Sequence, residues 1–236
     1  MSHYSVAIVH KEGQDIDEML AKYDENIDVK PYIRRTKEKV IEEAQFLKKK
    51  VFEQNRQHEE WFKPYLEAET DEELYKVAVG DLVDEEGNEL SRYNPDSKWD
   101  WYVIGGRWRG LLKSKEDGEC YDELPMTEID FSPDDNTYKE YLEEWEDIMS
   151  GDSFYNPDYI LNTYGTKEEY TRRMSVFSTY AILTPEDEWI EPGKVGWFGV
   201  SDASSENKKK YEEKYMDIIN RYMSDKYIMT IVDCHI

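Results

Sequence analysis

The fold is decided at the two ends of the chain, which read HYSVAIVH at residues 3–10 and YIMTIVDC at residues 227–234. Both runs are rich in β-branched and aromatic residues, which is typical of strands. Further strands are expected at residues 99–104, 108–112 and 176–184. Strands at both ends and in the middle, separated by helical segments, predict an α+β fold with a mixed or antiparallel sheet that includes both terminal strands.

The segments between these strands carry helical signals. Apolar residues recur at positions 40, 44, 47 and 51, which predicts a long amphipathic helix over residues 36–62. Capping boxes begin at Thr70 and Thr166, and they predict helices over residues 71–79 and 167–174. Helices are also expected at residues 15–23, 137–149 and 205–223. We expect a single α+β domain over residues 1–236, because no Gly/Ser-rich linker interrupts the chain.

The charge is unevenly distributed along the chain. The protein has 30 Lys and Arg against 54 Asp and Glu, a formal net charge of -24. Residues 114–170 hold 3 basic and 18 acidic side chains, so more than half of the excess lies there. We expect this segment to be an acidic insertion or lobe on the domain. The excess of acidic over basic side chains argues against direct nucleic-acid binding and against an anionic membrane as partner.

Composition also limits the class of protein. Hydrophobic residues make up 39% of the chain and aromatic residues 14%, enough for a sizeable core. Cys120 and Cys234 form no CxxC pair, and the first residues lack the features of a signal peptide. No apolar run is long enough to span a bilayer. We therefore expect a cytoplasmic protein. The acidic run at residues 84–87 fails the EF-hand pattern, and no metal site or cofactor is predicted.

The densest candidate site is the run NPDSKWDWYVIGGRWRG at residues 94–110. If residues 107–109 are extended, Arg107 and Arg109 point to one face and Trp108 to the other. Paired guanidinium groups suit phosphate or carboxylate oxygens, and indole rings offer stacking surfaces. The alternative is structural: the tryptophans belong to the core, the glycines form a turn and the arginines pair with carboxylates. The candidate ligand-binding residues of this run are Trp99, Trp101, Gly105, Gly106, Arg107, Trp108 and Arg109.

The second candidate lies at the C-terminus, where Asp233 and His235 share one face of a strand and Cys234 faces the other way. This alternation argues against a Cys–His nucleophile pair. Asp233 and His235 could act as orienter and base or as two metal ligands, joined by His3 or His10 if the first strand lies alongside. The alternative is a hydrogen-bonded histidine with a structural role.

The third candidate is the run GKVGWFG at residues 193–199, in which Trp197 could close over a ligand. The following helix would offer backbone amides near Ser204 and Ser205 to an anion. An ordinary loop whose aromatic residues fill the core is the alternative. The sequence assigns no catalytic residue in any of the three candidates.

Several of these strings, in this order, resemble an uncharacterised family of bacterial and phage proteins. The strings are KWDWY at residues 98–102, GGRW at 105–108, GWFG at 196–199 and VDCHI at 232–236. Relatives often carry a second Trp where Phe198 stands. The resemblance implies no known activity. It implies a phage origin, and with it an action against host defences in the host cytoplasm.

These observations lead to three hypotheses about the function. The first is a phage-type protein that binds, and acts as a sponge for, a phosphorylated or nucleotide-like small molecule such as a host defence signal. The second is a nucleotide-processing hydrolase or transferase that uses Asp233 and His235. The third is an acidic nucleic-acid mimic that inhibits a host protein through residues 114–170. Assembly of the protein into a homo-oligomer is compatible with all three hypotheses.

Overall fold

The structure is a computed structural model that describes residues 2–133, 135–195 and 200–236, and the chain divides into two compact units. One unit comprises residues 1–24 and 97–236, and the other comprises residues 25–96. The sequence predicts a single α+β domain over residues 1–236 and gives no sign of this division. The chain passes between the two units without a Gly/Ser-rich linker. The composition of the sequence therefore does not mark the boundaries between the units.

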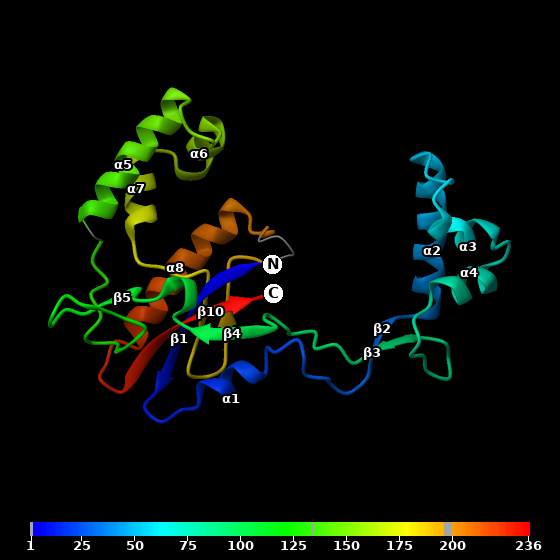
Figure 1. The fold of residues 1–236 in the computed structure, drawn as a ribbon, viewed down its shortest axis with the longest axis horizontal. Helices are drawn as coiled ribbons and strands as arrows, with labels where there is room; N and C mark the ends of the chain where they lie inside the picture. Colours follow the sequence, from blue (N-terminus) through cyan, green and yellow to red (C-terminus); the bar gives the residue numbers. More distant parts are fainter. Residues whose placement is uncertain (1, 134, 196–199) are drawn as a thin grey trace. The chain divides into compact units, whose positions relative to one another are not determined.

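The first unit is built on a mixed sheet in the order β4-β10-β1-β8-β9, with β7 also paired to β10 (Figure 1). The central strands β1 and β10 are antiparallel, and β8 runs parallel to β1. The predicted α+β fold with both terminal strands in the sheet is confirmed. The strands are β1 (His3–Lys11), β4 (Trp101–Ile104), β7 (Glu123–Pro125), β8 (Ala181–Leu183), β9 (Trp189–Ile190) and β10 (Tyr227–His235).

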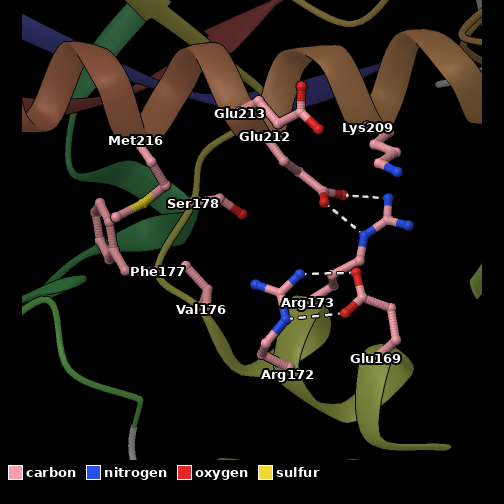
Figure 2. Close-up of a pocket in the computed structure, with 10 residues that line it drawn as sticks. All are labelled: Glu169, Arg172, Arg173, Val176, Phe177, Ser178, Lys209, Glu212, Glu213 and Met216. Atoms are coloured by element: carbon pink, nitrogen blue, oxygen red, sulfur yellow. Dashed lines mark hydrogen bonds and ion pairs between the residues drawn. The ribbon is translucent and has the colours of Figure 1, made fainter. Parts of the chain in front are cut away.

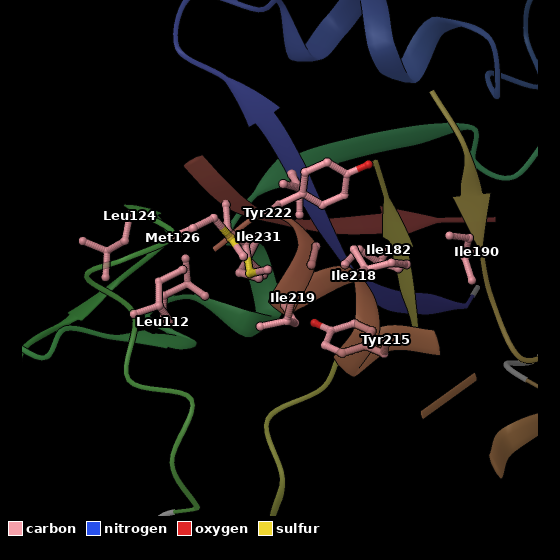
Figure 3. Close-up of a cluster of buried hydrophobic side chains, with 14 of the residues drawn as sticks. Leu112, Leu124, Met126, Ile182, Ile190, Tyr215, Ile218, Ile219, Tyr222 and Ile231 are labelled. Atoms are coloured by element: carbon pink, nitrogen blue, oxygen red, sulfur yellow. The ribbon is translucent and has the colours of Figure 1, made fainter. Parts of the chain in front are cut away.

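Alternate residues of β1 and β10 are buried on opposite faces of this sheet, as the period of two in a strand requires. Ala7 and Ile231 pack with Ile218 and Ile219 of helix α8 (Ser205–Arg221), in the cluster that Figure 3 shows. On the other face, Val6, Ile8, Val232 and Cys234 pack with Met19 and Leu20 of α1 (Ile16–Ala21). Helices on both faces explain why seven successive residues of each central strand are buried.

The acidic segment divides into two structural parts. Leu112, Leu124, Met126 and Ile129 come from the chain around its first part and join the core under α8. The helices that follow bury their own cluster of Trp145, Ile148, Ile160 and Tyr170. The elements are η2 (Gly106–Trp108), β5 (Leu112–Lys113), β6 (Cys120–Tyr121), α5 (Asp135–Ser150), α6 (Pro157–Tyr164) and α7 (Lys167–Ser175).

The second unit is mostly helical. The helix expected over residues 36–62 ends at Glu53, because Asn55 adopts a φ of 54° and closes a Schellman turn. Its two hydrogen bonds run from Arg56 N–H to the Val51 carbonyl and from Asn55 N–H to the Phe52 carbonyl. The elements are β2 (Tyr32–Arg35), α2 (Lys37–Glu53), η1 (Glu60–Phe62), α3 (Lys63–Glu67), α4 (Asp71–Ala78) and β3 (Glu89–Ser91).

In the described part of the chain, no helix combines the length and the apolar character that crossing a membrane requires.

The second unit contains a buried ion pair whose contribution depends on pH. Glu89 lies on β3 with its side chain 4% exposed, and its Oε2 is 2.5 Å from Nη2 of Arg35 on β2. The hydrogen bond from Arg35 lowers the pKa of Glu89 below its usual value. Because the folded pKa is the lower one, this stabilisation is present at neutral pH and is lost as the pH falls through the folded pKa.

We predict that Glu89→Gln lowers the free energy of unfolding by about 1–3 kcal/mol at pH 7 and by less at pH 3. Glu43→Gln is the matched control, because Glu43 binds the same Arg35 but is 46% exposed, and it should cost about 0.5 kcal/mol or less. Hydrogen exchange of the α2 and α4 amides in the full chain measures both changes. Equal losses in the two variants would contradict a specific role for the buried pair.

Candidate functional site

The pairing of β1, β10 and β4 brings two histidines together at one end of the main sheet. His3 lies opposite His235 in the β1–β10 pair, and Trp101 of β4 lies opposite His235 on its other side. Residues directly opposite one another in an antiparallel pair point to the same face, and Asp233 shares that face two residues earlier. We call His3, Asp100, Trp101, Asp233 and His235 the histidine cluster.

Each histidine of the cluster is held by a different carboxylate. His3 Nδ1 lies 2.8 Å from Asp233 Oδ1, and His235 Nδ1 lies 2.6 Å from Asp100 Oδ1. The side chains of His3, Asp233 and His235 are 11%, 3% and 7% exposed, and that of Asp100 is 27% exposed. The two rings meet edge to face with centroids 5.0 Å apart. Two adjacent imidazoles therefore have their Nδ1 atoms fixed by carboxylates. In each ring, Nε2 is the nitrogen that can contact a ligand or transfer a proton.

The free nitrogen of one ring is unsatisfied. His235 Nε2 is buried and has no hydrogen-bond partner in the described part of the chain. Leaving a buried polar atom unpaired costs about 1–3 kcal/mol, so proteins retain few such atoms. An unpaired nitrogen beside a second oriented histidine is the arrangement expected where a ligand supplies the missing partner.

The C-terminal sequence alone does not give this pairing. The sequence left open whether Asp233 and His235 act as orienter and base or as two metal ligands, with His3 or His10 beside them; in the structure the Asp233 carboxylate binds His3 across the sheet. The partner of His235 is Asp100, which lies in the KWDWY run and was not among the predicted site residues. Asp100 precedes β4 and also donates its backbone N–H to the His235 carbonyl. Only the β10–β4 register reveals this pairing, because the two residues are 135 positions apart in the chain.

The diglycine positions Asp233. Gly105 and Gly106 have φ values of 71° and 53°, in the region that favours glycine. A Cβ on Gly106 would lie 2.4 Å from the Asp233 Cβ, so the backbone passes directly against this side chain. Asp233 Oδ2 accepts a hydrogen bond from the Arg107 backbone N–H at 3.1 Å. The glycines thus support the His3–Asp233 pair by letting the backbone approach the Asp233 carboxylate closely.

The predicted pair of arginines does not form on a strand. Residues 106–108 make a 3-10 turn, so the extended geometry expected for residues 107–109 is wrong. The positive φ values of the diglycine turn the chain out of β4 before Arg107. Both arginines are exposed, and Arg109 Nε lies 3.9 Å from Asp122 Oδ2 with its side chain 85% exposed. The Arg107 backbone is nevertheless bound to the histidine cluster through Asp233.

The tryptophans have different roles. Trp99 is buried in the core on the α1 face, where its Nε1 donates to the Leu20 carbonyl at 3.2 Å. Trp108 packs on the edge of the core under α8. Trp101 is 44% exposed and stacks on His235 with ring centroids 5.0 Å apart and planes at 16°. Of these three rings, only Trp101 lies at the histidine cluster. Trp197 lies outside the described residues.

Cys234 faces away from the cluster into the core on the α1 face. Burial raises the pKa of its thiol, which favours the unreactive neutral form. Within the described residues, no group of three or more His, Cys, Asp or Glu side chains could hold a metal ion. The two imidazoles and their carboxylates can donate and accept hydrogen bonds and can transfer protons.

A groove of about 310 Å³ lies between α7 and α8, and Figure 2 shows the side chains that line it. The Arg173 guanidinium binds both carboxylate oxygens of Glu212 at 2.5 and 2.7 Å, and Arg172 binds Glu169 in the same bidentate way. Because both guanidinium groups are occupied by carboxylates, we do not take this groove as the functional site. The histidine cluster does not line it, and Trp101 provides the exposed edge of the cluster.

No family model, curated protein or solved structure matches this chain.

We predict that Gly106→Ala destabilises the protein by about 2–4 kcal/mol, through a strained φ and a clash with Asp233. Gly118→Ala is the matched control, because Gly118 has a φ of 74° but nothing lies within 4 Å of its Cβ position. The control should lose about 1 kcal/mol, from the backbone alone. Urea unfolding measures both losses, and the NMR signals of the His3 ring should shift only in Gly106→Ala. Equal losses and an unchanged His3 signal would contradict the role assigned to the diglycine.

Proposed function

We propose that the protein acts on a phosphorylated or nucleotide-like small molecule by acid–base chemistry at the histidine cluster, as a hydrolase or transferase. The observation that carries this proposal is the buried, unpaired Nε2 of His235, whose Nδ1 is held by Asp100. A ligand hydroxyl or water molecule would supply the missing hydrogen-bond partner of this nitrogen.

The tautomer of His235 follows from its partner. A carboxylate only accepts hydrogen bonds, so the proton of a neutral His235 ring lies on Nδ1 and Nε2 presents a lone pair. The same argument applies to His3, whose Nδ1 faces Asp233. One imidazole would remove a proton from the attacking group while the other, in its protonated form, would donate one to the leaving group. The carboxylates would hold each ring in the orientation that this transfer requires.

Two further features support the ligand class. The exposed indole of Trp101 extends the stacked ring of His235 and offers a flat surface to a base. The Arg107 backbone binds Asp233, its side chain is exposed, and a guanidinium suits a phosphate group. The resemblance to phage proteins makes host signalling nucleotides the first compounds to test.

Binding without turnover is the second candidate. The same unpaired nitrogen and stacked rings would serve a protein that retains its ligand as a sponge. The exposed Trp101 favours binding without turnover, since a stacking surface contributes to affinity without contributing to proton transfer. The two candidates share one site and differ in whether the ligand is recovered intact.

We predict that the purified protein converts at least one member of a panel of mono-, di- and cyclic nucleotides, as followed by liquid chromatography with mass spectrometry. His235→Ala should lower the rate between about a hundredfold and ten-thousandfold, because a general base is lost. Asp100→Asn should also lower it, because a neutral amide oxygen holds the Nδ1–H less strongly than a carboxylate does. His58→Ala is the matched control, because His58 is exposed in the other unit, and it should leave the rate unchanged.

Native mass spectrometry of the same samples separates the two candidates. A nucleotide that is retained intact by the protein, and released by His235→Ala, would identify a binding protein. Full conversion by His235→Ala would disprove the assigned base. A wild-type protein that neither binds nor converts any member of the panel would overturn both candidates.

A further inference from the structure

A second candidate site lies between β9 and α8, where an open groove of about 370 Å³ is lined by three lysines. Lys210 and Lys214 come from α8, and Lys98 comes from the segment before β4. Asn207, Lys210 and Lys214 are three and four residues apart, so they share one stripe of the helix. In a chain with a net charge of -24, a groove that collects three cations is unusual.

The one carboxylate among the residues that line this groove is already engaged. Glu191 Oε1 binds Lys98 Nζ at 2.6 Å, and Glu191 Oε2 accepts from Trp189 Nε1 at 2.8 Å. The side chains of Lys98 and Glu191 are 20% and 12% exposed, so this pair is part of the fold. Glu191 therefore neutralises Lys98 and orients the indole, and it does not cancel the charge of the two helical lysines.

The helical lysines have partners that an anion can replace. Lys210 Nζ lies 2.5 Å from Glu206, and Lys214 Nζ lies 2.8 Å from Glu188. All four of these side chains are at least half exposed, and neither Glu206 nor Glu188 lines the groove. Exposed ion pairs contribute about 0–1 kcal/mol, and long lysine stems turn easily. A phosphate group in the groove would thus recruit both ammonium groups at little cost.

We propose that this groove binds the phosphate group of a small anion, with Lys210 and Lys214 as the charged contacts and the Asn207 amide as a neutral donor. The volume matches a small-molecule pocket, whose usual range begins at about 300 Å³. A long nucleic-acid strand is disfavoured, because the rest of the protein would repel it. This site is separate from the histidine cluster and does not depend on the function proposed there.

Isothermal titration calorimetry with pyrophosphate at low ionic strength tests the proposal. We expect saturable binding at one site, weakened at least about tenfold by the double variant Lys210→Gln with Lys214→Gln. The matched control is Lys208→Gln with Lys209→Gln, which removes the same charge from the same helix outside the groove. The control should change the affinity about twofold or less, and thermal melts should show that all variants are folded.

The outcomes distinguish this site from the histidine cluster. The His235→Ala variant should bind pyrophosphate as the wild type does. Loss of nucleotide turnover in this variant would therefore not count against the groove as an anion site. Equal weakening by the two double variants would mean general charge attraction and would overturn the proposal. Absence of pyrophosphate binding by the wild type would overturn it as well. Preference for a single-stranded oligonucleotide over pyrophosphate would replace the small anion with a nucleic-acid partner.

Discussion

The antiparallel pairing of β1 with β10 is the contact on which the rest of the structure depends. It joins the two ends of the chain at the centre of the main sheet, and residues such as Val6 and Val232 are fully buried on it. Because both faces are covered by helices, each strand had to be apolar along most of its length. The rest of the chain, including the separate unit of residues 25–96, lies in sequence between these two strands.

The same pairing builds the histidine cluster. A shift of the register by one residue would turn His3 or His235 to the other face and bury it among the residues that pack on α1. The diglycine adds a second constraint, since only a backbone without a Cβ passes so close to Asp233. The apolar burial that stabilises the fold therefore also orients two imidazoles, because His3 and His235 lie on the two central strands of the sheet.

Acidic and basic side chains are concentrated in different parts of the protein. Residues 114–170 carry more than half of the acidic excess, whereas the groove beside β9 is lined by three lysines. In the groove between α7 and α8, each arginine is bound bidentately by a carboxylate of the protein. The two grooves differ in one pair in particular: Arg173 is buried and bound bidentately, so its pair is costly to break, whereas the pairs of Lys210 and Lys214 are at least half exposed.

Local patterns in the sequence determined the class of fold, the strands at both ends and the helices that begin at Thr70 and Thr166, because these depend on neighbouring residues alone. They also placed Asp233 and His235 on one face and Cys234 on the other. Tertiary structure decided that Asp233 binds His3, that Asp100 binds His235 and that Trp99 is a core residue while Trp101 is exposed. These outcomes depend on strand register and on chain reversal at Gly105 and Gly106, which bring together residues more than a hundred positions apart. No local pattern encodes such a contact, since a side chain's partner across a sheet is set by the packing of the whole strand pair.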